Sequence, residues 1–175
     1  EGADAAADDL AQLRQSMKVK YKALGDHILG IFVTDESGLL LTGELASGKE
    51  YKGSNIASRG YFQEAKKTSK AIVGDIVRSK STGKLIYVAC APIISGEGKF
   101  LGAFGMSVHA DQLVDTISGK KYGESGYAFM ANSKGIINSH PKEEFILDLD
   151  LKTLQGMEGI TRAMLDGNEG VERYV

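Results

Sequence analysis

A short internal repeat constrains this sequence more than any other feature. Residues 32–40 and 129–137 each open with phenylalanine, carry a glycine six residues later and end on two aliphatic residues. In the first copy Asp35 precedes Gly38. Such a pair provides a side-chain acceptor and a residue that tolerates positive φ, which is typical of a hairpin turn. The repeat predicts two related modules, and the second lacks the strands that close the first.

The pattern of apolar residues predicts an α+β fold, because a helix, a hairpin and a second helix precede a meander of three strands. Gly- and Ser-rich turns separate the three strands. We expect a long helix over about 4–29, a hairpin over 30–42, a short helix over 58–68 with Ser58 as its N-cap, strands over 71–77, 84–94 and 100–108, and a further helix over 154–165.

The long N-terminal helix carries a narrow apolar stripe. Leu10, Met17 and Leu24 recur every seven residues on an otherwise charged segment. A stripe of this width fits a helix that packs on its own domain, and it also fits one that meets a partner helix.

Charge and cysteine content exclude several classes of protein. With 21 basic and 23 acidic residues the net charge is −2, so we expect no nucleic-acid partner. Cys90 is the one cysteine and lies in the apolar run 85–94, where we expect a small core residue. No segment reaches the roughly 18 to 20 apolar residues that span a bilayer. The start at Glu1 rather than Met indicates a piece cut from a larger protein.

Nothing in the sequence indicates catalysis. The glycine-rich phosphate and dinucleotide motifs and the nucleophile-elbow motif are missing. His27, His109 and His140 are far apart and show no metal-ligand spacing. We therefore expect no catalytic residue, no metal and no cofactor.

An anion site is the most specific chemistry that the residues suggest. Arg59 falls at the start of the predicted 58–68 helix, where the helix dipole is positive and disfavours a merely decorative cation. Free backbone N–H groups and a guanidinium fork together suit a carboxylate. Tyr61 and Phe62 would add a hydroxyl donor and an apolar wall. The alternative is a surface arginine beside two core aromatics.

An ordered series of short motifs covers nearly the whole chain. They are Asp35-x-x-Gly38, Arg59-x-Tyr61-Phe62-x-x-Ala65, Ser81-Thr82-Gly83-Lys84, Ala91-Pro92-Ile93, Gly98-x-x-x-Gly102, Gly123-x-x-Gly126-Tyr127-Ala128-Phe129 and Gly135-Ile136-Ile137-Asn138-Ser139-His140-Pro141. This series resembles the Cache family of extracytoplasmic sensor domains in its two-module form. The helix beginning at Arg59 is also similar to the ligand helix of dicarboxylate sensor kinases in the same superfamily.

The resemblance implies a stalk helix over 1–30, a membrane-distal, PAS-like ligand-binding module over 31–118 and a partial membrane-proximal module over 119–175. It places the domain on the periplasmic or extracellular face of a bacterial inner-membrane protein, between transmembrane helices absent from this chain. The full-length receptor is expected to be a homodimer and most often a methyl-accepting chemotaxis protein. The alternatives are a histidine kinase, a cyclic-dinucleotide enzyme, a ligand-free structural spacer, or a cytoplasmic PAS-type domain with haem or flavin.

The resemblance also predicts the ligand pocket, in which Arg59 clamps an anionic group and Tyr61 donates a hydrogen bond. The predicted pocket consists of Arg59, Tyr61, Phe62, Val77, Ser79, Tyr87 and Ser107. Amino-acid-binding members have acids near positions 79 and 107 that hold the ammonium group, and the dicarboxylate sensors have a lysine near 107. This chain has serine at both positions, so we expect a small organic acid anion rather than an amino acid.

Overall fold

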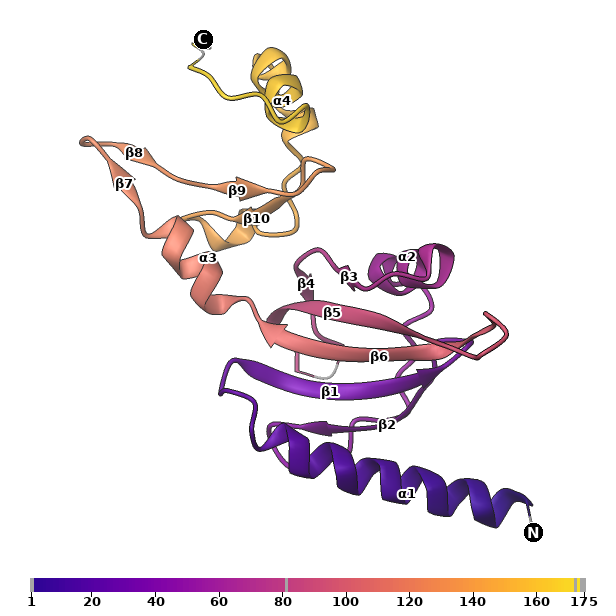
Figure 1. Ribbon diagram of the computed structural model, residues 1–175. Coiled ribbons are helices and arrows are strands. Elements are labelled where there is room, and N and C mark those ends of the chain that lie inside the picture. The colour runs from indigo at the N-terminus through magenta and orange to yellow at the C-terminus, as the bar shows by residue number, and fades with distance from the viewer. Residues whose placement is uncertain (1, 81, 172, 174–175) are drawn as a thin grey trace. The chain divides into compact units, whose positions relative to one another are not determined.

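The computed structural model describes residues 2–80, 82–171 and 173. The chain divides into two compact units, residues 1–109 (unit 1) and 110–175 (unit 2). The contacts group residues 110–118 with unit 2, whereas the sequence had assigned them to the first module. Figure 1 labels the elements of both units.

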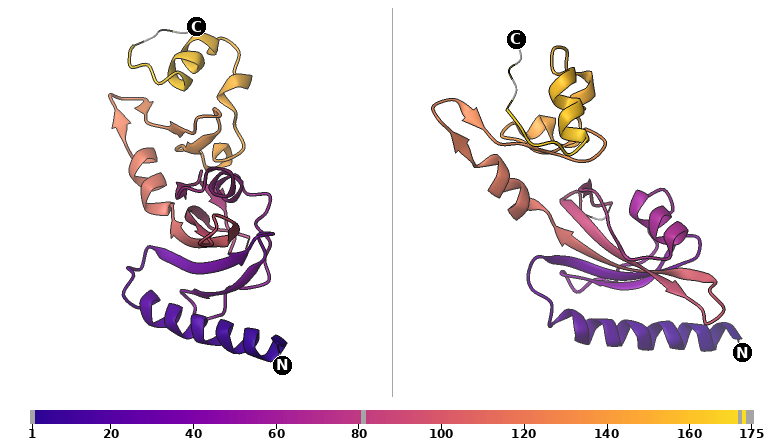
Figure 2. Two further views of the ribbon diagram at one scale, coloured as in Figure 1. Left: turned by 45° about the vertical axis from the view of Figure 1, so that its right-hand side comes forward. Right: turned by 45° about the horizontal axis from the view of Figure 1, so that its top comes forward.

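Unit 1 is a six-stranded antiparallel sheet with a long helix at its N-terminus, which confirms the predicted α+β fold. The strand order is β2-β1-β6-β5-β3, and β4 also pairs with β5. The elements are α1 (Gly2–Tyr21), β1 (Ile28–Asp35), β2 (Leu40–Leu45), α2 (Gly60–Thr68), β3 (Ile72–Val73), β4 (Val77–Arg78), β5 (Leu85–Ile94) and β6 (Phe100–His109). Helices α1 and α2 lie on opposite sides of this sheet (Figures 1 and 2).

The α2 side of the sheet holds the larger hydrophobic core. Because side chains alternate along a strand, β5 sends Ile86, Val88 and Cys90 to this side. Its buried members are Leu29, Phe32, Leu40, Tyr51, Ile56, Tyr61, Phe62, Ala65, Ile86, Val88, Cys90 and Ala103. The ring of Phe32, 1% exposed, meets Tyr51 edge to face with centroids 5.4 Å apart. This core fixes helix α2 on the sheet.

The α1 side holds a smaller core and a group of charged residues. Its buried apolar members are Met17, Ile28, Ile31 and Val108. Arg14 of α1 reaches Glu44 and Glu50, with nitrogen-to-oxygen distances of 3.6 and 3.4 Å. Helix α1 is therefore attached to the β1–β2 edge partly by ion pairs.

Three helix boundaries differ from the predictions, and the helix expected over 154–165 begins at Glu158. Helix α1 ends at Tyr21 rather than near residue 29, because Ile28 pairs with Val108 in the sheet and the preceding residues form turns. Helix α2 begins at Gly60, and its N-cap is Arg59 rather than Ser58.

The predicted strand over 71–77 is interrupted and forms the two short strands β3 and β4. Between them Gly74 lies against Tyr61, so close that a Cβ atom at Gly74 would stand 2.8 Å from the ring. A bulky strand residue therefore does not fit at this point, and the chain bends around the tyrosine.

Unit 2 contains the second copy of the sequence repeat in shorter elements. They are α3 (Asp111–Ser118), β7 (Lys121–Tyr122), β8 (Gly126–Tyr127), β9 (Met130–Ala131), β10 (Ile137–Ser139), the 3-10 turns Glu143–Phe145 and Leu151–Thr153, and α4 (Glu158–Leu165). Asn132 Oδ1 accepts hydrogen bonds from the backbone N–H groups of Lys134 and Ile136. Asp35 Oδ1 does the same for Ser37 and Leu39 in unit 1. The predicted repeat of turn chemistry is therefore confirmed.

Candidate functional site

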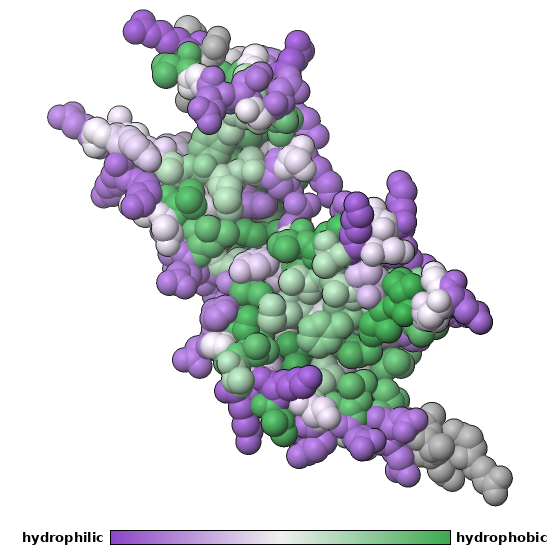
Figure 3. Space-filling model, in the orientation of Figure 1, coloured by the Kyte–Doolittle hydropathy of each residue, from purple (hydrophilic) through white to green (hydrophobic). Residues whose placement is uncertain are grey.

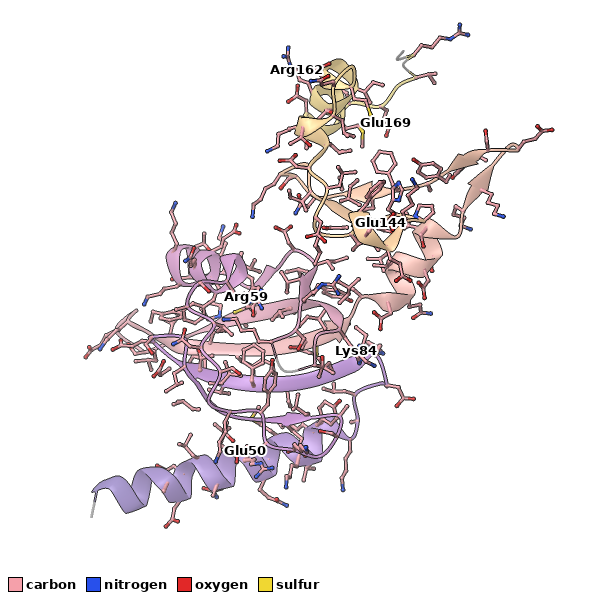
Figure 4. All side chains as sticks on the ribbon, turned by 180° about the vertical axis from the view of Figure 1, so that it is seen from behind. Glu50, Arg59, Lys84, Glu144, Arg162 and Glu169 are labelled. Carbon is pink, nitrogen blue, oxygen red and sulfur yellow. The ribbon has the colours of Figure 1, made fainter. Side chains whose placement is uncertain are left out.

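Arg59 stands at the N-terminus of helix α2. Its backbone is extended, with φ −79° and ψ 131°, and its side chain does not cap the helix. The side chain is partly buried, and Nη2 donates a hydrogen bond to the backbone carbonyl of Arg78, 3.0 Å away. Figure 4 labels Arg59 beside the sheet on the side of α2. The guanidinium fork has five N–H donors, so this one bond leaves most of its capacity for a ligand.

The repeated turn positions Arg59. The carboxylate of Asp35 folds residues 35–39 tightly, and Gly38 adopts φ +84°. A Cβ atom at Gly38 would lie 2.8 Å from the backbone nitrogen of Ala57. The close approach allows Ile56 N–H to bond the carbonyl of Gly38, and Arg59 N–H then bonds the carbonyl of Ile56. The Asp-x-x-Gly motif therefore anchors the segment that leads into α2.

Tyr61 and Phe62 are core residues as well as predicted site residues. Their exposed fractions are 7% and 3%, and Phe62 packs edge to face on Phe100 with centroids 5.7 Å apart. Burial raises the pKa of the Tyr61 phenol far above its ordinary value, and the nearby Arg59 charge opposes this only in part. Tyr61 therefore stays protonated and keeps an O–H to donate.

Val77, Ser79 and Ser107 also lie on the α2 side. Val77 packs against the large core, and Ser79, two residues along, is 5% exposed. Ser107 pairs with Val88 on one neighbouring strand and is fully buried. Among the residues that the structure describes, Ser107 Oγ has no hydrogen-bond partner, and a buried hydroxyl without a partner costs free energy.

Tyr87 does not join the other predicted residues. It alternates with the α2-side residues Ile86 and Val88 and belongs to the smaller core on the α1 side. The structure therefore brings six of the predicted residues to one side of the sheet and places Tyr87 on the other.

Two residues of this region were not predicted. The Nζ atom of Lys80 donates to the backbone carbonyl of Asn55 at 2.9 Å. Tyr51 is 7% exposed, lies in the same core cluster as Tyr61 and contributes to raising the pKa of that residue. Tyr51 lies in a polar stretch without periodicity, so no sequence signal marked it.

Other chemistry is sparse in the described part of the chain. Residues 2–80, 82–171 and 173 contain no group of three or more His, Cys, Asp or Glu placed to hold a metal. No described helix has both the length and the hydropathy for a membrane span. Burial raises the pKa of the Cys90 thiol to about 11, so this cysteine stays a protonated core residue.

Two hollows of unit 1 have linings that do not include Arg59. One, of about 870 Å³, is an open groove beside the end of α1 and includes Tyr21, Asp26 and Glu44. The other, of about 230 Å³, has an apolar lining that includes Val73, Phe104 and Met106. Figure 3 shows apolar residues at the surface over the strands of unit 1.

A family model described as Cache domain matches residues 3–175. The chain belongs to the Cache domain family. The family is one of sensor domains that bind ligands, so the predicted resemblance is confirmed over nearly the whole chain.

Similar proteins agree with this assignment. Over 90 residues, this Cache domain is 26% identical to the methyl-accepting chemotaxis protein PscA of Pseudomonas syringae pv. tomato, covering 51% of this chain but 14% of that receptor. The chain is thus a small fraction of the curated relative that it matches.

Solved structures share the fold. The extracellular domain of the putative histidine kinase mmHK1S-Z2 has a TM-score of 0.71 and 19% identity, over 89% of this chain and 68% of the other. The ligand-binding domain of Mlp24 with asparagine has a TM-score of 0.59 and 20% identity, over 86% of this chain and 65% of the other. At such identities the likeness concerns the fold, and the ligand must be argued from the residues of this chain.

Proposed function

We propose that this Cache domain senses a small carboxylate outside the cytoplasm and that Arg59 is the residue that clamps it. The observation that carries the proposal is the position of the Arg59 guanidinium. It stands at the positive end of helix α2 and donates to a neutral carbonyl. A carboxylate is a stronger, bidentate acceptor for a guanidinium than a peptide carbonyl, and the helix dipole favours an anion there.

The neighbouring side chains suit the rest of a small acid. Tyr61 retains its hydroxyl proton. On the same side of the sheet the hydroxyl oxygen of Ser107 is buried and has no hydrogen-bond partner among the described residues. Both groups offer hydrogen bonds to a carboxylate oxygen or to a ligand hydroxyl. Phe62 and Val77 supply apolar contact.

The same residues disfavour an amino acid as the ligand. An ammonium group removed from water requires a carboxylate or several oxygen acceptors. The predicted site residues on the α2 side include no acid. Mlp24 was solved with asparagine, so a shared fold alone leaves the ligand class open, and the side chains of this chain favour a monocarboxylate.

The receptor around this domain is also a proposal. The relative PscA is a methyl-accepting chemotaxis protein, and the mmHK1S-Z2 structure is the extracellular domain of a putative histidine kinase. We infer that this chain is the periplasmic or extracellular part of a homodimeric transmembrane chemoreceptor, with a histidine kinase as the second candidate. Unit 1 would be the membrane-distal, ligand-binding module and unit 2 part of the membrane-proximal module. Ligand binding would favour one arrangement of α1 over another by population shift.

A thermal-shift screen tests the ligand class. Acetate, propionate, lactate and pyruvate are compared with asparagine, valine and a sugar panel. A true ligand at about 100 times its Kd adds roughly 2.7 kcal/mol to the free energy of unfolding. We expect a carboxylate to give this stabilisation in the wild type and to lose it in Arg59→Met.

Arg78→Met is the matched control. It removes the same charge from the neighbouring segment, yet it keeps the backbone carbonyl that Arg59 bonds. We expect it to retain the stabilisation by the carboxylate. Stabilisation by amino acids alone would contradict the proposed ligand class, and no stabilisation by any compound would favour a structural spacer.

A further inference from the structure

Two side-chain hydrogen bonds cross between the same two segments of unit 1. Arg59 Nη2 donates to the carbonyl of Arg78 at 3.0 Å, and Lys80 Nζ donates in the opposite direction to the carbonyl of Asn55 at 2.9 Å. One segment, 55–59, leads into helix α2, and the other, 78–80, continues from strand β4. The two bonds span 19 and 25 residues of sequence, so neither follows from local secondary structure.

The segment held by these bonds carries a predicted site residue. Ser79 lies between the carbonyl that Arg59 bonds and the lysine that bonds Asn55. Its side chain is 5% exposed, whereas Arg78 and Lys80 on either side are exposed. The turn between β4 and β5 fixes the Ser79 side chain, whose Oγ accepts a hydrogen bond from Thr82 N–H at 3.3 Å. The two cross-segment bonds join the residues on either side of Ser79 to segment 55–59.

The two bonds differ in what a ligand would do to them. A carboxylate at Arg59 competes with the carbonyl of Arg78 for the guanidinium, because the charged acceptor is the stronger one. Lys80 bonds a carbonyl at Asn55, at the other end of the 55–59 segment. Once Arg59 turns to a ligand, the bond from Lys80 still joins the two segments.

We propose that Lys80 is a positioning residue of the ligand site, which holds segment 78–80 against segment 55–59 and so keeps Ser79 in place while Arg59 binds the anion. This inference rests on the proposed function. A preorganised site binds more tightly because less conformational freedom is lost on binding. Lys80 contributes to affinity in this way without touching the ligand.

The experiment measures Kd by calorimetry for acetate, propionate, lactate and pyruvate in the wild type and three variants. Lys80→Met removes the tether, and Lys80→Arg restores a cationic donor. Lys84→Met is the matched control, because Lys84 is exposed in the same connection between β4 and β5. Its hydrogen bonds with described residues use its backbone: the N–H donates to Thr82 Oγ1 and the carbonyl accepts from Ser79 N–H. We expect Lys80→Met to raise the Kd about fivefold, the effect of losing one net hydrogen bond. Lys84→Met should leave the Kd unchanged and Lys80→Arg should recover most of the affinity.

Hydrogen exchange at the Ser79 backbone N–H is a second measurement, and the loss of a positive charge elsewhere on the surface does not change its rate. The backbone N–H of Ser79 bonds the carbonyl of Lys84, and we expect it to exchange faster in Lys80→Met, with and without the acid, but not in Lys84→Met. If an acid binds and Lys80→Met retains the wild-type Kd and the wild-type exchange rate, the positioning role is wrong and the proposed function stands. If none of the four acids binds the wild type, the proposed function fails and the role of Lys80 fails with it.

Discussion

The two sides of the sheet in unit 1 are built differently. The α2 side closes over twelve buried core residues, from Leu29 to Ala103, most of them apolar. The α1 side buries four apolar residues and adds the ion pairs of Arg14. Apolar burial is non-directional and scales with area, whereas an ion pair requires a particular geometry and is sensitive to salt and pH.

This difference indicates that the α2 side stabilises the fold, whereas helix α1 on the other side can change its position. The α2 side, which holds Arg59 and Tyr61, derives its rigidity from close packing. Helix α1 is held partly by polar contacts, and the hydroxyl of Tyr21 also bonds the carbonyl of Ile28. A helix attached in this way changes position at lower cost than one embedded in a core, and this suits the element that we propose to carry the signal.

The largest expected effect compares one residue type on the two sides. Phe32 is 1% exposed in the α2-side core, and Phe104 is 38% exposed on the α1 side. Phe32→Ala should lower the free energy of unfolding by about 3–5 kcal/mol, since the lost transfer energy and the cavity add. Phe104→Ala should cost about 1 kcal/mol or less, because the Phe104 side chain is already partly exposed and its removal gives up less buried apolar area. Urea denaturation of each variant measures the difference, and equal costs would remove the contrast between the two sides.

The sequence predicted this architecture well where one pattern decides the outcome. Apolar segments separated by Gly- and Ser-rich turns located β5 and β6 to within about one residue. The Asp-x-x-Gly turn was predicted from residue chemistry alone. Asp35 supplies the side-chain acceptor for the turn, and Gly38 adopts the positive φ that the turn requires. Arg59 was found because a cation at the start of a helix is unusual.

Long-range contacts limited the rest. The heptad pattern continues past Tyr21 to Leu24 and Ile28, yet pairing of Ile28 with Val108 ends the helix earlier. Alternation along β5 places Tyr87 on the other side of the sheet from Ile86 and Val88. The sequence does not specify which of the two sides faces α2, because that depends on how the strands pair. The bond from Lys80 to Asn55 depends on the tertiary fold in the same way.

A second test concerns the attachment of α1. Glu44 has an exposed side-chain fraction of 8%, and Arg14 is its ion-pair partner. Arg14→Met leaves a buried carboxylate without a counter-charge, which we expect to cost about 2 kcal/mol, less than a fully buried pair because Arg14 is partly exposed. Thermal or urea denaturation measures the loss.

Two controls sharpen this test. Arg14→Met combined with Glu44→Gln should recover part of the stability, because the unpaired charge is gone. Lys52→Met removes an exposed partner of Glu50, 2.9 Å away, and should cost about 0.5 kcal/mol or less. A single Arg14→Met variant as stable as the wild type would show that α1 is held by its apolar contacts alone.

The smallest effect is the response of the α1 side to acid. The hydrogen bond from Lys52, with help from Thr42 and the charge of Arg14, outweighs partial burial and lowers the pKa of Glu50 below its ordinary value of 4.5. A carboxyl whose folded-state pKa is depressed contributes stability above its unfolded pKa and loses it as the pH falls through the folded value. Stability should therefore decline below about pH 4.5 through this group.

Glu50→Gln should be less stable than the wild type at pH 7, and the difference in the free energy of unfolding between the two proteins should narrow as the pH falls below 4.5. Asp35 also has a lowered pKa, since bonds from Ser37 and Leu39 outweigh its burial, so the difference between the two proteins, rather than the slope of either, isolates Glu50. A gap that stays constant down to pH 3 would mean that the charge of Glu50, paired with Lys52 and with Arg14 of α1, contributes nothing to the stability of the α1 side.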